Sequence, residues 1–204
     1  MHATALFAGK NAGTNTARYY SFTQGLTHFI VFTAEAYLYA RDASFIENQL
    51  NFMKADLGAV DRKVTPWVVA LVHKDWTMEA EAYAAFSPIL QDAKVDILFC
   101  GHVHYYNRYL PYDVVTNDID MASVSQDGST YTNPKYMTII VTGASGDREK
   151  DNKYTKESPS FTGTENYGYG VFTATNATHA TWKFKTVKAD KGPDYADSLT
   201  WIKN

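Results

Sequence analysis

Three short runs of mainly apolar residues set the strongest limit on the fold of this chain. They cover residues 28–33, 67–72 and 95–100, and they are rich in β-branched and aromatic side chains with no proline or glycine inside. Such runs are typical of strands that are buried on both faces. Helical patterns separate them, at residues 45–57 and at about residues 78–91. This order of strands and helices predicts an α/β fold with a parallel sheet.

Both predicted helices carry signals for their ends and for their buried faces. Ser44 and Glu47 form a capping-box pattern at the start of the first helix. Pro88 is expected to kink or shorten the second helix, because proline donates no backbone hydrogen bond. The residues expected to face the core are Ile46, Leu50, Met53 and Leu57 in the first helix, and Tyr83, Phe86 and Leu90 in the second.

The segments before and after this pattern have a different texture. Residues 1–18 are rich in Ala, Gly, Thr and Asn without periodicity, which predicts a poorly ordered lead-in, and the folded domain is expected over residues 19–204. After residue 109 the pattern predicts short strands that form an antiparallel edge of the same domain. These strands are expected over residues 136–142, 169–174, 180–187 and 198–202.

Composition and charge exclude several classes of partner and site. Lys and Arg number 19 and Asp and Glu number 22, giving a net charge of −3, so no basic excess is available to bind nucleic acid. The apolar runs are shorter than the roughly 20 residues that cross a bilayer, and no signal peptide is recognised, so no membrane partner is expected. Cys100 is the single cysteine, so any metal is expected on His, Asp, Glu, Asn or Tyr.

Histidines gather at the predicted carboxyl ends of the strands. His73 ends the second apolar run, and His102 and His104 follow the third across Gly101, which suits a sharp turn. Ligand sites of α/β sheets lie at this edge. An extended backbone would project His102 and His104 to one side and direct Val103 into the fold. The trio therefore predicts a metal site, and the spacing alone also permits a mononuclear zinc ion bound by three histidines.

Three other polar residues favour simpler interpretations. His28 lies within a strand and is expected to be a hydrogen-bonded structural residue. Nothing places His179 beside the trio. Asn176 begins an Asn-Ala-Thr sequence, the N-glycosylation acceptor pattern, which matters only in a secretory protein.

The segment around the three histidines resembles the C-terminal half of the purple acid phosphatases, in the metallophosphoesterase superfamily. The resemblance implies part of an α/β sandwich with mixed sheets, with residues 19–204 as the C-terminal portion of a calcineurin-like metallophosphoesterase domain whose N-terminal half is missing. The motifs that carry it are His73 after an apolar strand, residues 95–108 (VDILFCGHVHYYNR), upstream residues 19–31 and 61–67, and downstream residues 141–144, 167–170 and 176–180.

The resemblance also implies a chemistry. Members of the family hydrolyse phosphate monoesters at acidic pH, at a dinuclear centre of Fe(III) beside Zn(II), Mn(II) or Fe(II). By position, His73 and His102 would bind the divalent metal and His104 the ferric ion. A secreted, lysosomal or vacuolar location would follow.

Further residues take their expected roles from the same resemblance. Tyr106 and Arg108 would support the histidine-bearing loop, with Asn107 between them where the family usually has Glu. The histidine pair that plant relatives often carry after the strand-ending histidine is absent from this sequence. Asp75 is then the nearest candidate for the acid that protonates the leaving group.

The ligand motifs of the family's N-terminal half do not occur in this sequence. Gly146-Asp147 sits in a late glycine turn and does not replace them. Neutral imidazoles alone do not offset the repulsion between two adjacent metal cations, so this chain alone is expected to hold at most one divalent metal. Two alternatives stay open. The first is an inactive half-domain that acts as a binding or regulatory module, with self-association through its exposed face. The second is a mononuclear three-histidine hydrolase.

Overall fold

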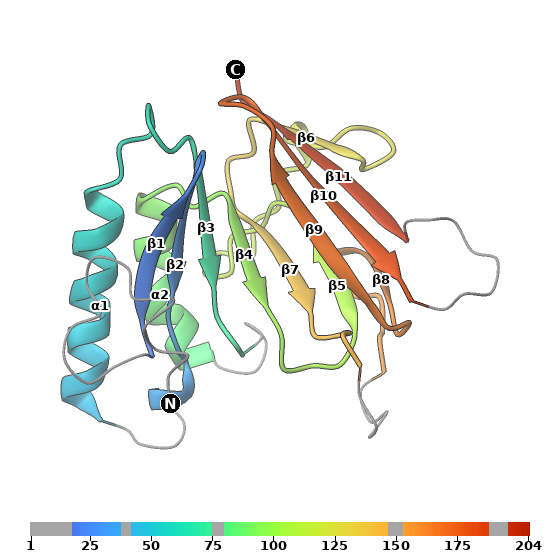
Figure 1. Ribbon diagram of the computed structural model, residues 1–204. Helices are drawn as coiled ribbons and strands as arrows, with labels where there is room; N and C mark the ends of the chain where they lie inside the picture. Colours follow the sequence, from blue (N-terminus) through green and yellow to red (C-terminus); the bar gives the residue numbers. More distant parts are fainter. Residues whose placement is uncertain (1–17, 38–41, 75–79, 147–152, 188–195) are drawn as a thin grey trace.

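In the computed structural model, the three apolar runs form neighbouring parallel strands of a seven-stranded sheet (Figure 1). The structure describes residues 18–37, 42–74, 80–146, 153–187 and 196–204. The sheet has the order β1-β2-β3-β4-β7-β5-β8, in which β2, β3, β4 and β7 are parallel and β1, β5 and β8 pair antiparallel to their neighbours. Its strands are β1 (Tyr20–Gln24), β2 (Thr27–Val31), β3 (Trp67–Leu71), β4 (Ile97–Cys100), β5 (Tyr106–Tyr109), β7 (Thr138–Thr142) and β8 (Ser160–Thr164).

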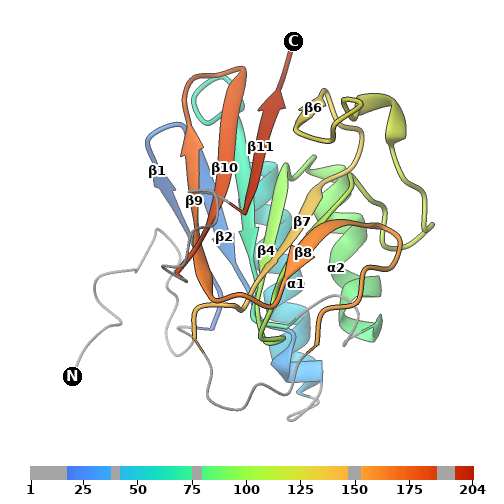
Figure 2. The same cartoon turned by 90° about the vertical axis from the view of Figure 1, so that its right-hand side faces the viewer.

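A four-stranded sheet covers one face of this sheet, and two helices cover the other (Figure 1, Figure 2). The smaller sheet has the order β6-β11-β10-β9, with β6 parallel to β11 and the remaining pairs antiparallel. Its strands are β6 (Thr130–Thr132), β9 (Gly168–Ala174), β10 (His179–Thr186) and β11 (Asp197–Ile202), and the helices are α1 (Ala43–Gly58), α2 (Ala80–Asp92) and a short 3-10 turn at Met121–Ser123. The prediction of an α/β sandwich with mixed sheets is confirmed.

The side chains of β3 and β4 alternate between two apolar cores. On one face they meet the helices, in a core that includes Met53 of α1 and Phe86 of α2. On the other face they meet the smaller sheet, in a core that includes Trp182 and Trp201. Both strands are apolar at every position because both of their faces are covered. The alternating residues are Val68, Ala70, Leu98 and Cys100 toward the helices, and Trp67, Val69, Ile97 and Phe99 toward the smaller sheet.

The first helix forms as predicted, but a different residue caps it. Asp42, not Ser44, is the N-cap of α1. Its carboxylate accepts hydrogen bonds from the backbone N–H of Phe45 at 3.1 Å and from the Ser44 hydroxyl at 2.8 Å. The same hydrogen bonds lower the pKa of Asp42, with the bond from Phe45 as the largest cause.

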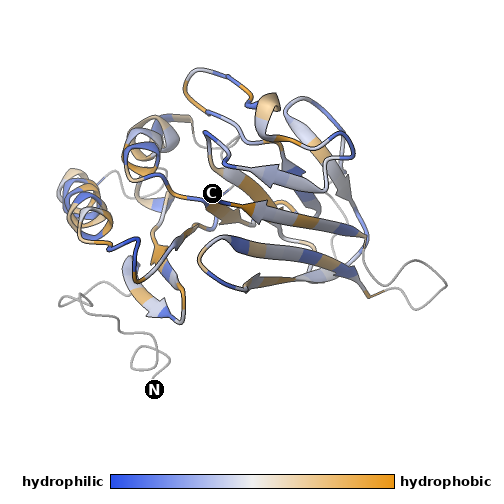
Figure 3. Ribbon diagram, turned by 90° about the horizontal axis from the view of Figure 1, so that it is seen from above, coloured by the Kyte–Doolittle hydropathy of each residue, from blue (hydrophilic) through white to orange (hydrophobic). Residues whose placement is uncertain are grey.

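The buried face of α1 differs from the predicted face by one position. Met53 and Leu57 are buried as predicted, but Gln49 is fully buried while Leu50 is only partly so. Gln49 tolerates burial because its amide is satisfied. It donates to the Thr33 carbonyl at 2.9 Å and accepts from the Thr33 N–H at 3.0 Å. Both helices carry apolar and hydrophilic segments side by side in Figure 3.

The second helix confirms the predicted buried face and corrects the predicted effect of its proline. Tyr83, Phe86 and Leu90 are buried. The helix continues through Pro88 to Asp92, so Pro88 does not shorten it. Its predicted start at residue 78 lies outside the described residues.

The strands after residue 109 do not form one antiparallel edge, which corrects the prediction. β7 lies inside the larger sheet and is parallel to β4, whereas β9, β10 and β11 build the smaller sheet. Their apolar pattern marks them as strands but does not distinguish an edge from a second layer. The predicted lead-in lies outside the described residues up to residue 17, and β1 begins at Tyr20.

A buried ion pair joins the two sheets. Arg108 on β5 donates from Nε to Asp197 Oδ2 at 2.6 Å and from Nη2 to Asp197 Oδ1 at 2.8 Å. Tyr106 also donates to Asp197, at 2.5 Å, and Arg108 donates to the Tyr131 hydroxyl at 2.6 Å. Trp182 on β10 donates its indole N–H to the Tyr106 hydroxyl at 3.0 Å. Burial, with the Asp197 charge, raises the pKa of Tyr106, so the phenol stays a neutral donor.

We predict that Asp197→Asn lowers the free energy of unfolding by about 3 kcal/mol, because it leaves a buried guanidinium without its counter-charge. Urea unfolding measures the change. The matched control is Asp118→Asn: Asp118 pairs with Lys135 at 3.6 Å, and both side chains are more than half exposed. The control should change stability by about 1 kcal/mol at most. Equal effects of the two substitutions would contradict this account of the sheet interface.

Candidate metal site

The ends of β3 and β4 bring two of the three predicted histidines into contact. Both strands end at the lower edge of the larger sheet in Figure 1. Nδ1 of His102 lies 3.2 Å from Nε2 of His73, and the two ring planes are nearly perpendicular, at 83°. The backbone holds this arrangement, because the Gly101 N–H donates to the His73 carbonyl at 2.9 Å.

His104 lies in the same loop and contributes to the electrostatics of His102. Burial lowers the pKa of His102, electrostatic interaction with Lys74, His73 and His104 lowers it further, and Glu35 acts in the opposite direction. The lowered pKa favours the neutral imidazole of His102, the form that binds metals. Glu35 follows β2 at the same sheet edge, and sequence reasoning did not single it out.

The backbone of the histidine loop is not extended, which corrects the expected geometry. His102 has φ +69°, a left-handed conformation that costs an ordinary residue about 1–2 kcal/mol. A Cβ added at Gly101 would meet only the His73 carbonyl, at the ordinary distance of 3.7 Å, so the turn depends on His102 and not on the glycine. Val103 is buried as predicted. Strain of this kind is typical of functional sites.

Gly143, which follows β7, allows the loop its position. A Cβ added there would lie 2.0 Å from the Val103 carbonyl oxygen, closer than any real contact. Only glycine therefore lets the loop pack this closely against the end of β7. The glycine stands in the segment 141–144 that contributed to the family resemblance, but the contact it permits was not predicted.

Lys74 is a member of the site that sequence reasoning missed. Its Nζ lies 3.1 Å from Nε2 of His102, and only 5% of the residue is exposed. Its own carbonyl accepts a hydrogen bond from the Tyr83 hydroxyl of α2 at 2.7 Å. The one available signal was its position directly after His73, since lysine is ordinarily assigned to the surface.

The predicted supporting residues lie on β5, the strand that directly follows the histidine loop. The hydrogen bonds of Tyr106 and Arg108 run to Asp197 and its neighbours in the sheet interface. Asn107 is buried, and its side-chain oxygen accepts from the Ser160 hydroxyl of β8 at 2.6 Å. These hydrogen bonds join β5 to β8 and to β11 of the smaller sheet. The histidine loop, which leads into β5, is therefore held in place at its C-terminal end.

Two of the residues singled out in the sequence, Asp75 and Asn176, do not contribute to the described histidine cluster. Asp75 is among the residues that the structure does not describe. Asn176 is exposed in the turn between β9 and β10, where its side-chain oxygen accepts from the N–H of Thr178 at 2.8 Å and of His179 at 2.8 Å. His179 therefore belongs to this turn.

His28 is a hydrogen-bonded structural residue, as predicted. Its Nε2 lies 2.9 Å from Asp56 Oδ2, and its Nδ1 lies 3.2 Å from the Thr23 hydroxyl. Asp56 also accepts from the Ser21 hydroxyl at 2.5 Å. These contacts tie β1 and β2 to α1.

The residues present do not fit a complete dinuclear metal centre. Across the described ranges, no three His, Cys, Asp or Glu side chains are grouped so that they could hold a metal ion. The donors that do meet are imidazoles, and Nε2 of His102 already faces the ammonium group of Lys74. A pair of metal cations also needs anionic donors, which the histidine trio does not provide.

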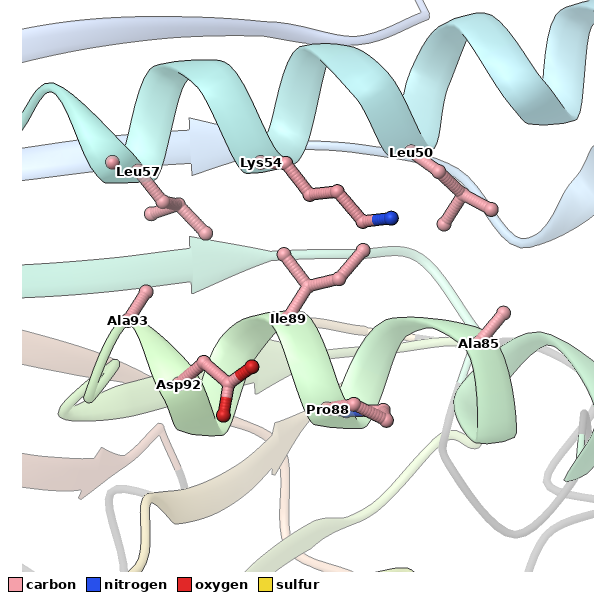
Figure 4. Close-up of a pocket in the computed structure, with 9 residues that line it drawn as sticks. Leu50, Lys54, Leu57, Ala85, Pro88, Ile89, Asp92 and Ala93 are labelled. Carbon is pink, nitrogen blue, oxygen red and sulfur yellow. The ribbon is translucent and has the colours of Figure 1, made fainter.

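A groove of about 650 Å³ between α1 and α2 is separate from this site (Figure 4). Leu50, Lys54 and Leu57 extend into it from α1, and Ile89 extends from α2. None of the candidate histidines lines it.

Comparison with known proteins finds purple acid phosphatases among the relatives of this sequence. Residues 136–198 match the family described as "Iron/zinc purple acid phosphatase-like protein C". Purple acid phosphatase 18 of Arabidopsis thaliana is 30% identical over 204 residues, which cover 95% of this chain and 42% of the relative. Purple acid phosphatase 1 of Ipomoea batatas is 30% identical, with 95% and 41% covered. The chain thus spans about two fifths of the length of these curated relatives.

Solved structures support the fold. A purple acid phosphatase from yellow lupin seeds aligns with a TM-score of 0.71 and 21% identity, over 91% of this chain and 33% of that one. GAP50, the anchor in the inner membrane complex of Plasmodium, aligns with a TM-score of 0.63 and 18% identity, over 93% and 56%. In the described part of the chain, neither helix is long and apolar enough to cross a membrane.

We predict that Gly143→Ala lowers the free energy of unfolding by about 1–3 kcal/mol and shifts the NMR signals of the His102 ring, because the added methyl group displaces the loop. Gly58→Ala is the control, since a Cβ at Gly58 meets nothing within 4 Å. The control should leave the His102 signals unchanged. An undisturbed His102 ring in Gly143→Ala would show that the close approach is not needed.

The left-handed backbone of His102 predicts that glycine is more stable than alanine at this position, the reverse of the usual order. His102→Gly should be about 1 kcal/mol more stable than His102→Ala, because glycine adopts this conformation without strain. At His179, in β10, the same two substitutions should rank in the opposite order, since glycine weakens a strand. Chemical denaturation of the four variants measures both differences, and the same ranking at both positions would refute the strain.

Proposed function

This chain belongs to the purple acid phosphatase family, and from that premise we propose that it supplies the C-terminal metal ligands of a phosphoric monoester hydrolase. The observation that carries the proposal is the contact between His73 and His102 at the carboxyl edge of the sheet, with His104 in the same loop. Residues 19–204 are then the C-terminal portion of a calcineurin-like metallophosphoesterase domain.

The three histidines have separate roles in this proposal. His73 and His102 would bind the divalent ion and His104 the ferric ion of an Fe(III) centre with Zn(II), Mn(II) or Fe(II), of which this chain supplies only these ligands. Such a pair, when bound, neutralises phosphoryl charge and activates water. The chain's own part is to hold the imidazole ligands at one sheet edge. Tyr106 and Arg108 serve this by fixing β5, the strand that ends the histidine loop, to the smaller sheet.

The substrate, the acid and the location follow from the same family. A phosphate monoester is the proposed substrate, and Asp75 is the proposed donor of the proton to its leaving group. A secreted, lysosomal or vacuolar location is proposed from the plant relatives. In such a compartment Asn176, exposed at the turn between β9 and β10, is a candidate for glycosylation.

A second candidate function is a binding or regulatory module without catalysis. The contact between Lys74 and His102 favours it, because it engages a nitrogen that a metal would need. GAP50 shares the fold and is described as an anchor, so this fold also occurs in a protein named for an anchoring role. In this role the chain would associate with a further copy of itself, through the surface that in the whole family domain packs against the N-terminal half.

We predict that the purified chain holds at most one divalent metal ion, and that His73→Ala, His102→Ala and His104→Ala each weaken Zn²⁺ binding by about tenfold or more. His179→Ala is the control and should bind as the parent does. Elemental analysis gives the stoichiometry and calorimetry gives the affinities. Two metal ions per chain, or affinities that none of the three substitutions changes, would contradict the assignment.

Assays of hydrolysis and of oligomeric state separate the two functions. Turnover of 4-nitrophenyl phosphate that His102→Ala abolishes would show that the chain is a hydrolase by itself. Absence of turnover from a stably folded oligomer, measured by light scattering, would favour the module.

A further inference from the structure

Lys74 and two histidines form a continuous chain of polar contacts at the carboxyl edge of the sheet. Nζ of Lys74 lies 3.1 Å from Nε2 of His102, and Nδ1 of His102 lies 3.2 Å from Nε2 of His73. Both ring nitrogens of His102 are therefore engaged. Lys74 is a buried residue, since only 5% of it is exposed.

The chemistry of the ammonium group sets the direction of these contacts. A lysine ammonium donates hydrogen bonds and accepts none, so Nε2 of His102 must be the acceptor. Neutral His102 then carries its proton on Nδ1 and donates it to Nε2 of His73. The lone pair on Nε2 of His102 faces a positive charge, which is the relation that the same lone pair has to a bound metal ion.

The fold holds the lysine in this position through its backbone. The Tyr83 hydroxyl of α2 donates to the Lys74 carbonyl at 2.7 Å, and the Gly101 N–H donates to the His73 carbonyl at 2.9 Å. The backbone of Lys74 is thus bonded to α2, and the backbone of His73, which precedes it, is bonded to the residue that follows β4. These two bonds fix the backbone from which the Lys74 side chain extends.

We propose that Lys74 takes the place of a metal ion at His102, so that the folded chain keeps its histidine cluster closed to divalent cations. The ammonium group occupies the lone pair that a metal would use and adds a positive charge beside it. A divalent ion binds only when this group is displaced, and removal of the ammonium opens the cluster. The proposal rests on the proposed function, in that it treats the histidines as metal ligands.

Calorimetric titration of Zn²⁺ into the metal-free chain tests the proposal. Lys74→Met keeps an unbranched side chain that is one atom shorter and removes the charge, and it should raise the affinity for Zn²⁺ by about tenfold or more. Lys74→Arg keeps the charge and should bind no more tightly than the parent. Lys54→Met is the matched control, because Lys54 lies on α1 in the groove away from the histidines. His102→Ala added to Lys74→Met should remove the gain.

Each other outcome overturns a defined statement. If the parent and Lys74→Met bind Zn²⁺ equally tightly and both need His102, the proposed ligands stand and the role of Lys74 falls. If no histidine substitution changes binding in either chain, the proposed function falls, and this proposal falls with it. If Lys54→Met tightens binding as much as Lys74→Met, the effect is one of net charge and not of this contact.

A measurement on the unsubstituted chain keeps the proposal testable if Lys74→Met does not fold. Nitrogen-15 NMR of the metal-free protein reports which ring nitrogen of His102 carries the proton. The expected tautomer is protonated on Nδ1, with Nε2 as acceptor. A proton on Nε2 would leave no acceptor for the ammonium group and would overturn the proposal.

Discussion

Burial of β3 and β4 on both faces is the constraint on which the rest of this structure depends. Each strand sends alternate side chains into the helix-side core and into the core between the sheets, so no position within them is available for a polar group. Chemistry is displaced to the residues that follow each strand. The ladder continues past the strands, since Val72 donates to the Phe99 carbonyl at 3.0 Å and Gly101 to that of His73 at 2.9 Å. The packing of the centre therefore determines where His73 and His102 meet.

The apolar pattern predicted this centre well, because strands buried on both faces and amphipathic helices are properties of local sequence. It did not predict β5, although all four residues of Tyr106–Tyr109 are buried. That strand reads Tyr-Asn-Arg-Tyr, and its burial depends on Asp197, which lies 89 residues beyond Arg108. The smaller sheet was placed wrongly for the same reason. A strand pattern states which faces are apolar but not which layer covers them.

The candidate site was predictable to the level of residue type and sheet edge, and no further. His73 and His102 were placed at one edge by the strands that precede them. The loop that carries His102 packs against Gly143, which follows a different strand, and no local rule anticipates such a contact. Lys74 was overlooked because lysine is rarely buried, and the imidazole that its ammonium group contacts follows the next strand of the sheet.

Two unusual local features of the described structure lie together at this edge. Gln49 and Arg108 show how buried polar side chains are satisfied in other parts of the fold: Gln49 has both bonds to Thr33, and Arg108 has a bidentate carboxylate. At the edge, His102 holds a left-handed backbone, and the ammonium group of the buried Lys74 contacts its ring. Backbone strain beside a cluster of chemically active side chains is typical of sites shaped by what they bind. Under the proposed assignment, the histidine edge keeps the geometry of a ligand site in this chain, whether a metal ion or the ammonium group of Lys74 supplies the positive charge.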